Sequence, residues 1–106
     1  MGRPLPQDRD HRIPLKEAAE QTRRQRSRRP TQIGDVGALT AKAIRELLDQ
    51  PGCVGMRYYR TRNAKDEGSM VLVGVDADGN DMVDGIVLDA ILPCPPYCSD
   101  DNALNS

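Results

Sequence analysis

The clearest pattern of apolar and polar positions lies in the middle of the chain, over residues 36–50. Apolar side chains recur there at intervals of three and four residues, and charged side chains occupy the positions between them. The apolar members are Val36, Leu39, Ala43, Ile44, Leu47 and Leu48. Asp35 suits the N-cap, and Pro51 followed by Gly52 is typical of a helix end. We therefore predict an amphipathic helix over residues 36–50 that buries this stripe.

A weaker helical pattern precedes it. Pro14 suits a first helical position, and small or apolar residues follow at helical spacing up to an arginine-rich run that stops before Pro30. This pattern predicts a first helix over residues 14–27.

Beyond residue 52 the pattern changes to the two-residue period of strands. Val54, Met56 and Tyr58 alternate with more polar or smaller residues, and residues 70–75 are apolar on both faces. Residues 86–88 offer a third strand, and the connections are a polar loop over 61–69 and a turn over 76–81. Two helices followed by an antiparallel meander of about three strands define an α+β fold.

The two ends differ from this central part. Residues 1–12 are polar and rich in proline and charge, which predicts a disordered segment. Residues 93–106 begin with three prolines and two cysteines, which predicts an extended tail. The folded α+β domain is therefore expected over residues 13–92.

Composition and charge point to a partner. Aromatic residues make up only 3% of the chain, so the core is small and aliphatic. The net charge of −1 hides a strong asymmetry, since residues 1–30 carry +5, residues 31–65 carry +3 and residues 66–106 carry −9. Either end can attract a molecule of opposite charge. We expect this molecule to be another protein.

No apolar run has the length of a secretory signal or a membrane helix. We accordingly predict a cytoplasmic protein that does not enter the membrane. In that reducing compartment the three cysteines are expected to be thiols or metal ligands rather than structural disulfides.

The cysteines are the first candidate site. Cys94 and Cys98 have a spacing that lets two thiolates hold one zinc ion, with Cys53 as a third ligand and His11 as the only histidine available for a fourth. A redox-active dithiol is a second interpretation, and simple packing of the cysteines against the sheet is a third. The sequence leaves these three open, and zinc is the only cofactor it suggests.

The second candidate site is a surface for a partner. Pro95, Pro96 and Tyr97 form a stiff segment, and Arg23, Arg24 and Arg26 form a basic cluster at the end of the first helix. Nucleic acid is disfavoured as the partner because the cluster has no neighbouring aromatic residue and the C-terminal half is acidic. No pairing of a nucleophile with a base is visible, which disfavours an enzyme. These features favour a non-enzymatic interaction or regulatory module, with a thiol-based metal-binding or redox protein as the alternative.

Four short motifs also carry a resemblance. They read QPGC at residues 50–53, LVGVD at 72–76, PCPPYC at 93–98 and LNS at 104–106. In this combination the chain resembles a family of short bacterial proteins with no known activity. The resemblance implies a cytoplasmic bacterial setting and assigns no catalytic residue.

Overall fold

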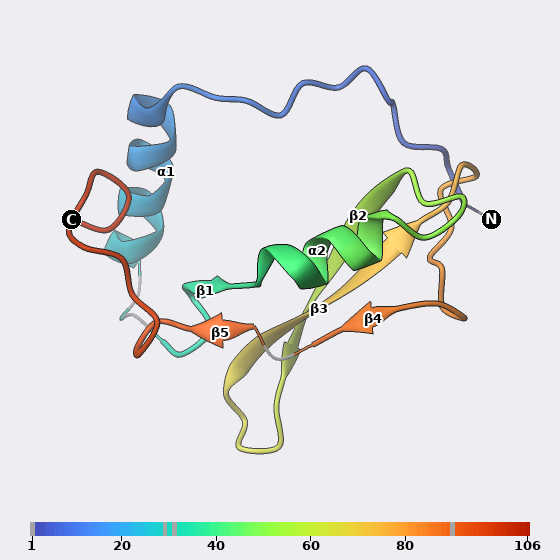
Figure 1. Ribbon diagram of the computed structural model, residues 1–106. Coiled ribbons are helices and arrows are strands. Elements are labelled where there is room, and N and C mark those ends of the chain that lie inside the picture. The colour runs from blue at the N-terminus through green and yellow to red at the C-terminus, as the bar shows by residue number, and fades with distance from the viewer. Residues whose placement is uncertain (1, 29, 31, 90) are drawn as a thin grey trace.

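The computed structural model describes residues 2–28, 30, 32–89 and 91–106, and it contains two helices and two antiparallel sheets (Figure 1). In chain order the elements are α1 (Leu15–Arg28), β1 (Gly37–Ala38), α2 (Ala41–Leu48), β2 (Gly55–Arg62), β3 (Gly68–Val75), β4 (Val87–Leu88) and β5 (Leu92–Pro93). The predicted α+β class is confirmed, and the first helix lies within one residue of its predicted bounds.

The larger sheet has the strand order β2-β3-β4, as the meander prediction required. The hairpin between β2 and β3 is tighter than expected, because both strands extend to Arg62 and Gly68. Asn63 closes it: its backbone N–H donates to the Glu67 carbonyl at 2.9 Å, and its Oδ1 accepts from the amides of Lys65 and Glu67. The predicted loop over 61–69 is therefore too long by two residues at each end.

The start predicted for the second helix is wrong. The helix begins at Ala41 because Thr40, not Asp35, is the N-cap, and Thr40 Oγ1 accepts from the Ala43 amide at 3.2 Å. Upstream, Gly37 and Ala38 form β1, which pairs with β5 at the other end of the sequence. Val36, predicted to be buried in the helix stripe, is 51% exposed.

The core is small and aliphatic. Its buried members are Ala19, Leu47, Leu72, Val73 and Val75. By register, Leu72 and Gly74 share the sheet face on which α2 ends, because a side chain at Gly74 would meet Cys53 Sγ at 3.0 Å and Gln50 Nε2 at 3.1 Å. Gln50 joins the layers, as its Oε1 accepts from the Ile86 amide at 2.7 Å. Its position fixes the end of α2 above the segment that leads into β4.

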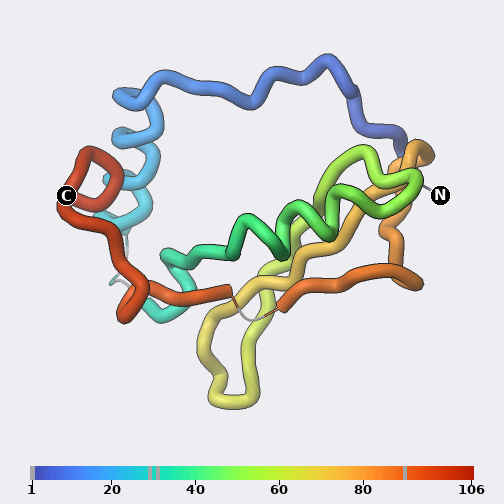
Figure 2. The backbone as a smooth tube through the Cα atoms, viewed as in Figure 1, coloured from blue at the N-terminus to red at the C-terminus, as the bar shows by residue number. Residues whose placement is uncertain are grey.

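The two terminal segments lie at opposite sides of the fold (Figure 2). Residues 2–14 form no helix or strand, and their first residues lie against the turn that follows β3, where the Arg3 carbonyl crowds Gly79. The chain then runs to α1, which stands apart from the sheets beside the C-terminal coil (Figure 1). Within the described ranges, neither helix has the length and apolar character needed to cross a lipid bilayer.

Candidate functional site

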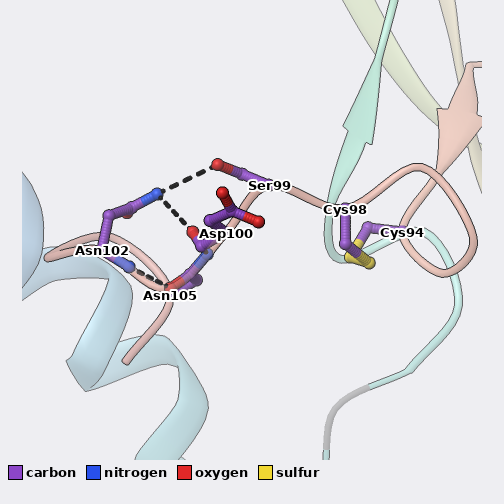
Figure 3. The surroundings of a disulfide bond; sticks show 6 residues. All are labelled: Cys94, Cys98, Ser99, Asp100, Asn102 and Asn105. Carbon is purple, nitrogen blue, oxygen red and sulfur yellow. Dashed lines mark hydrogen bonds between the residues drawn. A yellow bond between two sulfur atoms is a disulfide. The ribbon is translucent and has the colours of Figure 1, made fainter.

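The most distinctive local structure is a closed loop made by residues 94–98, which we call the disulfide loop. Cys94 and Cys98 are bonded to each other, with their Cα atoms 4.8 Å apart (Figure 3). The Tyr97 and Cys98 amides donate to the carbonyls of Pro93 and Pro96, both at 3.0 Å. These turns bring the two cysteines within bonding range. The disulfide between Cys94 and Cys98 differs from the thiols or metal ligands that the sequence predicts for a reducing compartment.

The disulfide loop is presented on the surface by a short ladder. Its first residue follows β5, and the Cys94 amide donates to the Val36 carbonyl at 3.0 Å, which extends the pairing of β5 with β1. Cys94 is half-buried, whereas the next four residues are exposed and Tyr97 is 59% exposed. The loop is thus anchored at its base, and the side chain of Tyr97 is exposed on it.

The third cysteine does not join this pair. Cys53 is a half-buried thiol in the connection between α2 and β2, and its Sγ donates to the Gly55 carbonyl at 3.2 Å. Among the residues whose positions are described, no three His, Cys, Asp or Glu side chains lie close enough to hold a metal ion. The structure therefore does not bring Cys53, Cys94, Cys98 and His11 together as the ligand set considered for zinc.

The basic cluster on α1 is divided between two roles. Arg26 Nη1 donates to the Leu104 carbonyl at 2.8 Å, and Nη2 donates to the Ser106 carbonyl. Arg26 therefore holds the end of the chain on α1, while Arg23 and Arg24 remain exposed. The spacing of the arginines along the sequence could not distinguish these roles.

Residues 99–106 form a compact coil between the disulfide loop and α1 (Figure 3). Asn102 organises it by donating from Nδ2 to Ser99 Oγ and to the Asp100 carbonyl, and by accepting the Leu104 amide on Oδ1 at 2.8 Å. A cavity of about 330 Å³ lies beneath the coil. Its lining comes from α1, the segment before β1 and the tail: Thr22, Gln25, Arg26, Asp35, Val36, Cys94, Pro95, Leu104 and Asn105.

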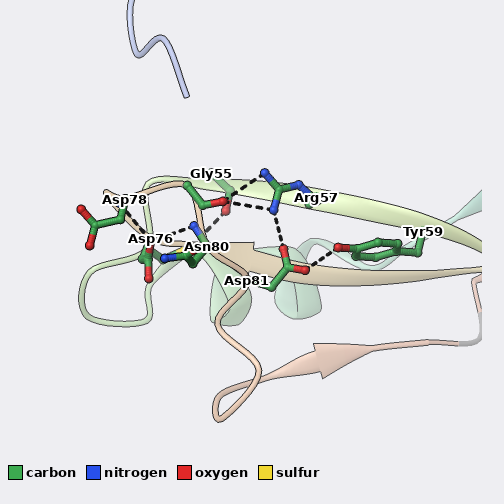
Figure 4. A network of polar contacts seen from close by, with 9 residues as sticks. Gly55, Arg57, Tyr59, Asp76, Asp78, Asn80 and Asp81 are labelled. Atoms are coloured by element: carbon green, nitrogen blue, oxygen red, sulfur yellow. Dashed lines mark hydrogen bonds and ion pairs between the residues drawn. The ribbon is translucent and has the colours of Figure 1, made fainter. Parts of the chain in front are cut away.

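A polar network on the larger sheet was not predicted from the sequence. Arg57 Nη1 donates to Asp81 Oδ1 at 2.6 Å and to the Gly79 carbonyl at 3.2 Å, and the Tyr59 hydroxyl donates to Asp81 Oδ2 (Figure 4). Arg57 and Tyr59 alternate on β2, so both point to one face, where Asp81 meets them. The network ties β2 to the turn after β3. Two polar residues at alternate strand positions were the only sequence signal for it.

The network makes stability depend on pH in acid. The Tyr59 hydroxyl, followed by Arg57, lowers the pKa of Asp81 below its ordinary value of 3.8. Because the carboxylate is stabilised in the fold, its contribution is fully present above about pH 5 and is lost as pH falls through the lowered pKa. We expect the stability difference between wild type and Asp81→Asn, measured by urea unfolding, to shrink as the pH falls below about 4.

The matched control for this prediction is Asp84→Asn. Asp84 is exposed and makes no hydrogen bond or ion pair in the described part of the chain. Its substitution removes the same charge without touching the network, so its stability difference from wild type should vary little with pH. An Asp81→Asn profile that parallels the Asp84→Asn profile would contradict the role given to the network.

Fold and site together define a small α+β protein that carries a disulfide-closed, exposed loop on a two-stranded ladder. No family model matches the chain, and no curated protein or solved structure matches it either. The resemblance to short bacterial proteins therefore stays a prediction.

Proposed function

We propose that this protein is a non-enzymatic protein-interaction module and that the disulfide loop is its contact surface. The observation that carries the proposal is the 59% exposure of Tyr97 within a loop that is closed covalently and anchored on β5. An exposed ring held on a rigid base is what an interface anchor requires.

Pre-ordering supports this proposal energetically. Pro95 and Pro96 have fixed φ angles, and the Cys94–Cys98 bond removes further freedom from the chain. A partner that binds the loop therefore has little conformational entropy to remove. Tyr97 adds a large apolar surface with a hydroxyl at its tip, a combination enriched at binding surfaces.

The exposed charges on α1 indicate which kind of partner the protein binds. Arg23 and Arg24 are exposed on α1, the helix that borders the cavity beside Cys94 and Pro95. They are available to acidic groups of the partner, whereas Arg26 is occupied by the tail. We therefore infer a protein partner with an apolar pocket for Tyr97 and acidic groups beside it.

The test uses a photo-activated cross-linking amino acid in place of Tyr97. We expect it to capture one protein in stoichiometric amount from native cell extract. That protein, once purified, should bind the wild type and lose at least about tenfold in affinity for Tyr97→Ala, since central aromatic anchors contribute this much or more. Tyr97→Phe should keep most of the affinity because it retains the ring.

A matched control places the same cross-linker at Val83, which is 70% exposed in a different loop. Capture of the same proteins from positions 83 and 97 would indicate nonspecific contact. An unchanged affinity of Tyr97→Ala for the purified partner would rule out the loop as the contact surface.

The bonded sulfurs of Cys94 and Cys98 favour a second candidate, a thiol–disulfide redox protein. Cys98 is exposed, so a thiolate from a dithiol reductant can attack its Sγ and release the Cys94 thiolate. The second thiolate of the reductant then attacks the mixed disulfide, which leaves two protein thiols and one oxidised reductant. For this second candidate we infer a cytoplasmic location, where disulfides that form and break during catalysis or redox sensing are the usual kind.

Two assays separate the interaction module from the redox and metal-binding alternatives: disulfide exchange with a dithiol protein, and zinc titration of the reduced chain. A redox protein should exchange its disulfide with a physiological dithiol protein and turn over repeatedly, whereas an interaction module should not. Stoichiometric zinc binding by the reduced chain, lost in Cys94→Ser, would instead favour the metal-binding interpretation.

A further inference from the structure

One long edge of the larger sheet carries no neighbouring strand. In the order β2-β3-β4, β2 is an edge strand of eight residues, and nothing in the described part of the chain pairs with its outer side. β2 contains no proline and no acidic residue. The N-terminal segment lies near the start of β2: Leu5 crowds Gly55, and residues 5–7, 9 and 11 line a hollow together with residues 54–56.

The phase of the ladder identifies the open backbone groups. Asn63 N–H donates to the Glu67 carbonyl, so residues in phase with Asn63, such as Tyr59 and Thr61, face β3. The alternate residues, Tyr58 and Arg60, therefore direct their N–H and C=O groups away from β3. These are the groups that an added strand would bond.

The side chains of β2 itself include three arginines and no acidic residue, although Asp35 of a neighbouring segment lies at the hollow described below. Arg57 is bound to Asp81, and Arg62 donates to the Asp66 carbonyl, but Arg60 makes no hydrogen bond or ion pair within the described residues. Tyr58 is 63% exposed. A hollow of about 550 Å³, lined by residues 32–35, 60–62, 68 and 69, opens beside Arg60.

We propose that the β2 edge binds an extended acidic peptide segment of another protein, which adds to the sheet as a further strand. Backbone bonds to Tyr58 and Arg60 would hold the segment, and an acidic side chain of the segment would meet the Arg60 guanidinium. This surface is separate from the disulfide loop. The outcome of a test of the β2 edge therefore does not bear on the proposed function of the disulfide loop.

Two other occupants fit less well. A second copy would bring the three arginines of each β2 onto adjacent strands, and like charges across strands are destabilising. Single-stranded nucleic acid uses successive rings on one face, but Tyr58 and Tyr59 point to opposite faces, and the Tyr59 hydroxyl is bonded to Asp81. The charge of the edge and its open backbone together favour an acidic peptide.

The experiment titrates the full-length protein with a short synthetic peptide of alternating glutamate and valine, followed by amide NMR. We expect saturable binding, with slowed hydrogen exchange at the Tyr58 and Arg60 amides and no slowing at Tyr97. Arg60→Glu should weaken binding by about tenfold, because a cross-strand attraction becomes a repulsion.

Two controls make the outcome decisive. The same peptide with N-methylated amides on its β2-facing residues keeps the charges but cannot form the ladder, so it should not bind. A lysine–valine peptide should not bind either. Equal binding of either control, or slowed exchange confined to other residues, would overturn the proposal.

The alternative occupants have their own signatures. Slowed exchange at Tyr58 and Arg60 that rises with protein concentration alone would show that a second copy occupies the edge. Binding of oligothymidine but not of the acidic peptide would show that the surface recognises nucleic acid. Either result would replace the peptide assignment.

Discussion

Replacing Leu47 with alanine is expected to lower the free energy of unfolding by about 2–5 kcal/mol. Leu47 is fully buried, and among the residues that the structure describes it is one of two large side chains that are completely enclosed. Its loss would leave a cavity between α2 and β3 that an aliphatic core of this size cannot refill. Small domains are stable by only about 5–15 kcal/mol, so the variant would lose a large share of its stability.

Leu48 provides a matched control in the next position of the same helix. It is 42% exposed, so Leu48→Ala removes the same atoms but leaves much less of a cavity. Urea unfolding followed by circular dichroism should show a loss for Leu48→Ala well below that for Leu47→Ala. Similar losses in the two variants would contradict the packing of α2 on the sheet.

The second large effect is expected at Gly34. Its φ of 95° lies in the left-handed region, and a Cβ built there would stand 2.3 Å from the Gly68 carbonyl oxygen. Gly34→Ala therefore combines backbone strain with a clash against backbone that cannot rotate away. We expect the strain and the clash together to lower the free energy of unfolding by about 2–5 kcal/mol.

Gly52 separates the two contributions. Its φ of 83° is similar, but a Cβ built there would meet no atom within 4 Å. Gly52→Ala should thus show only the strain of about 1–2 kcal/mol. Urea unfolding of both variants measures the difference, and equal losses would mean that the segment containing Gly34 does not pack closely on β3.

Both elements of the hairpin and both helices could be predicted from the sequence, because each depends on contacts close along the chain. The alternation from Val54 to Tyr58 and the apolar run over 70–75 indicated β2 and β3, and the spacing of Leu47 within its stripe indicated α2. The first helix followed from the same local periodicity. Local periodicity reports which side of an element is buried, and it needs no knowledge of the partner element.

The boundary of α2 could not be predicted in this way. Asp35 and Thr40 are both acceptable N-caps, and the choice between them depends on β1, whose partner β5 lies more than fifty residues away in the sequence. Once Gly37 and Ala38 pair with Leu92 and Pro93, they are extended and cannot begin a helix. The pairing of β1 with β5 therefore decided that Thr40, and not Asp35, is the N-cap of α2.

The candidate site shows the same division. The sequence by itself determined that Cys94 and Cys98 lie four residues apart with two prolines between them, and that Arg23, Arg24 and Arg26 gather at one helix end. Only the tertiary structure decided that the two sulfurs bond, that Cys53 lies elsewhere, and that Arg26 holds the tail while its neighbours stay exposed. Side-chain chemistry is written residue by residue along the chain, but which groups meet depends on how distant segments pack, and that packing is settled by the fold as a whole.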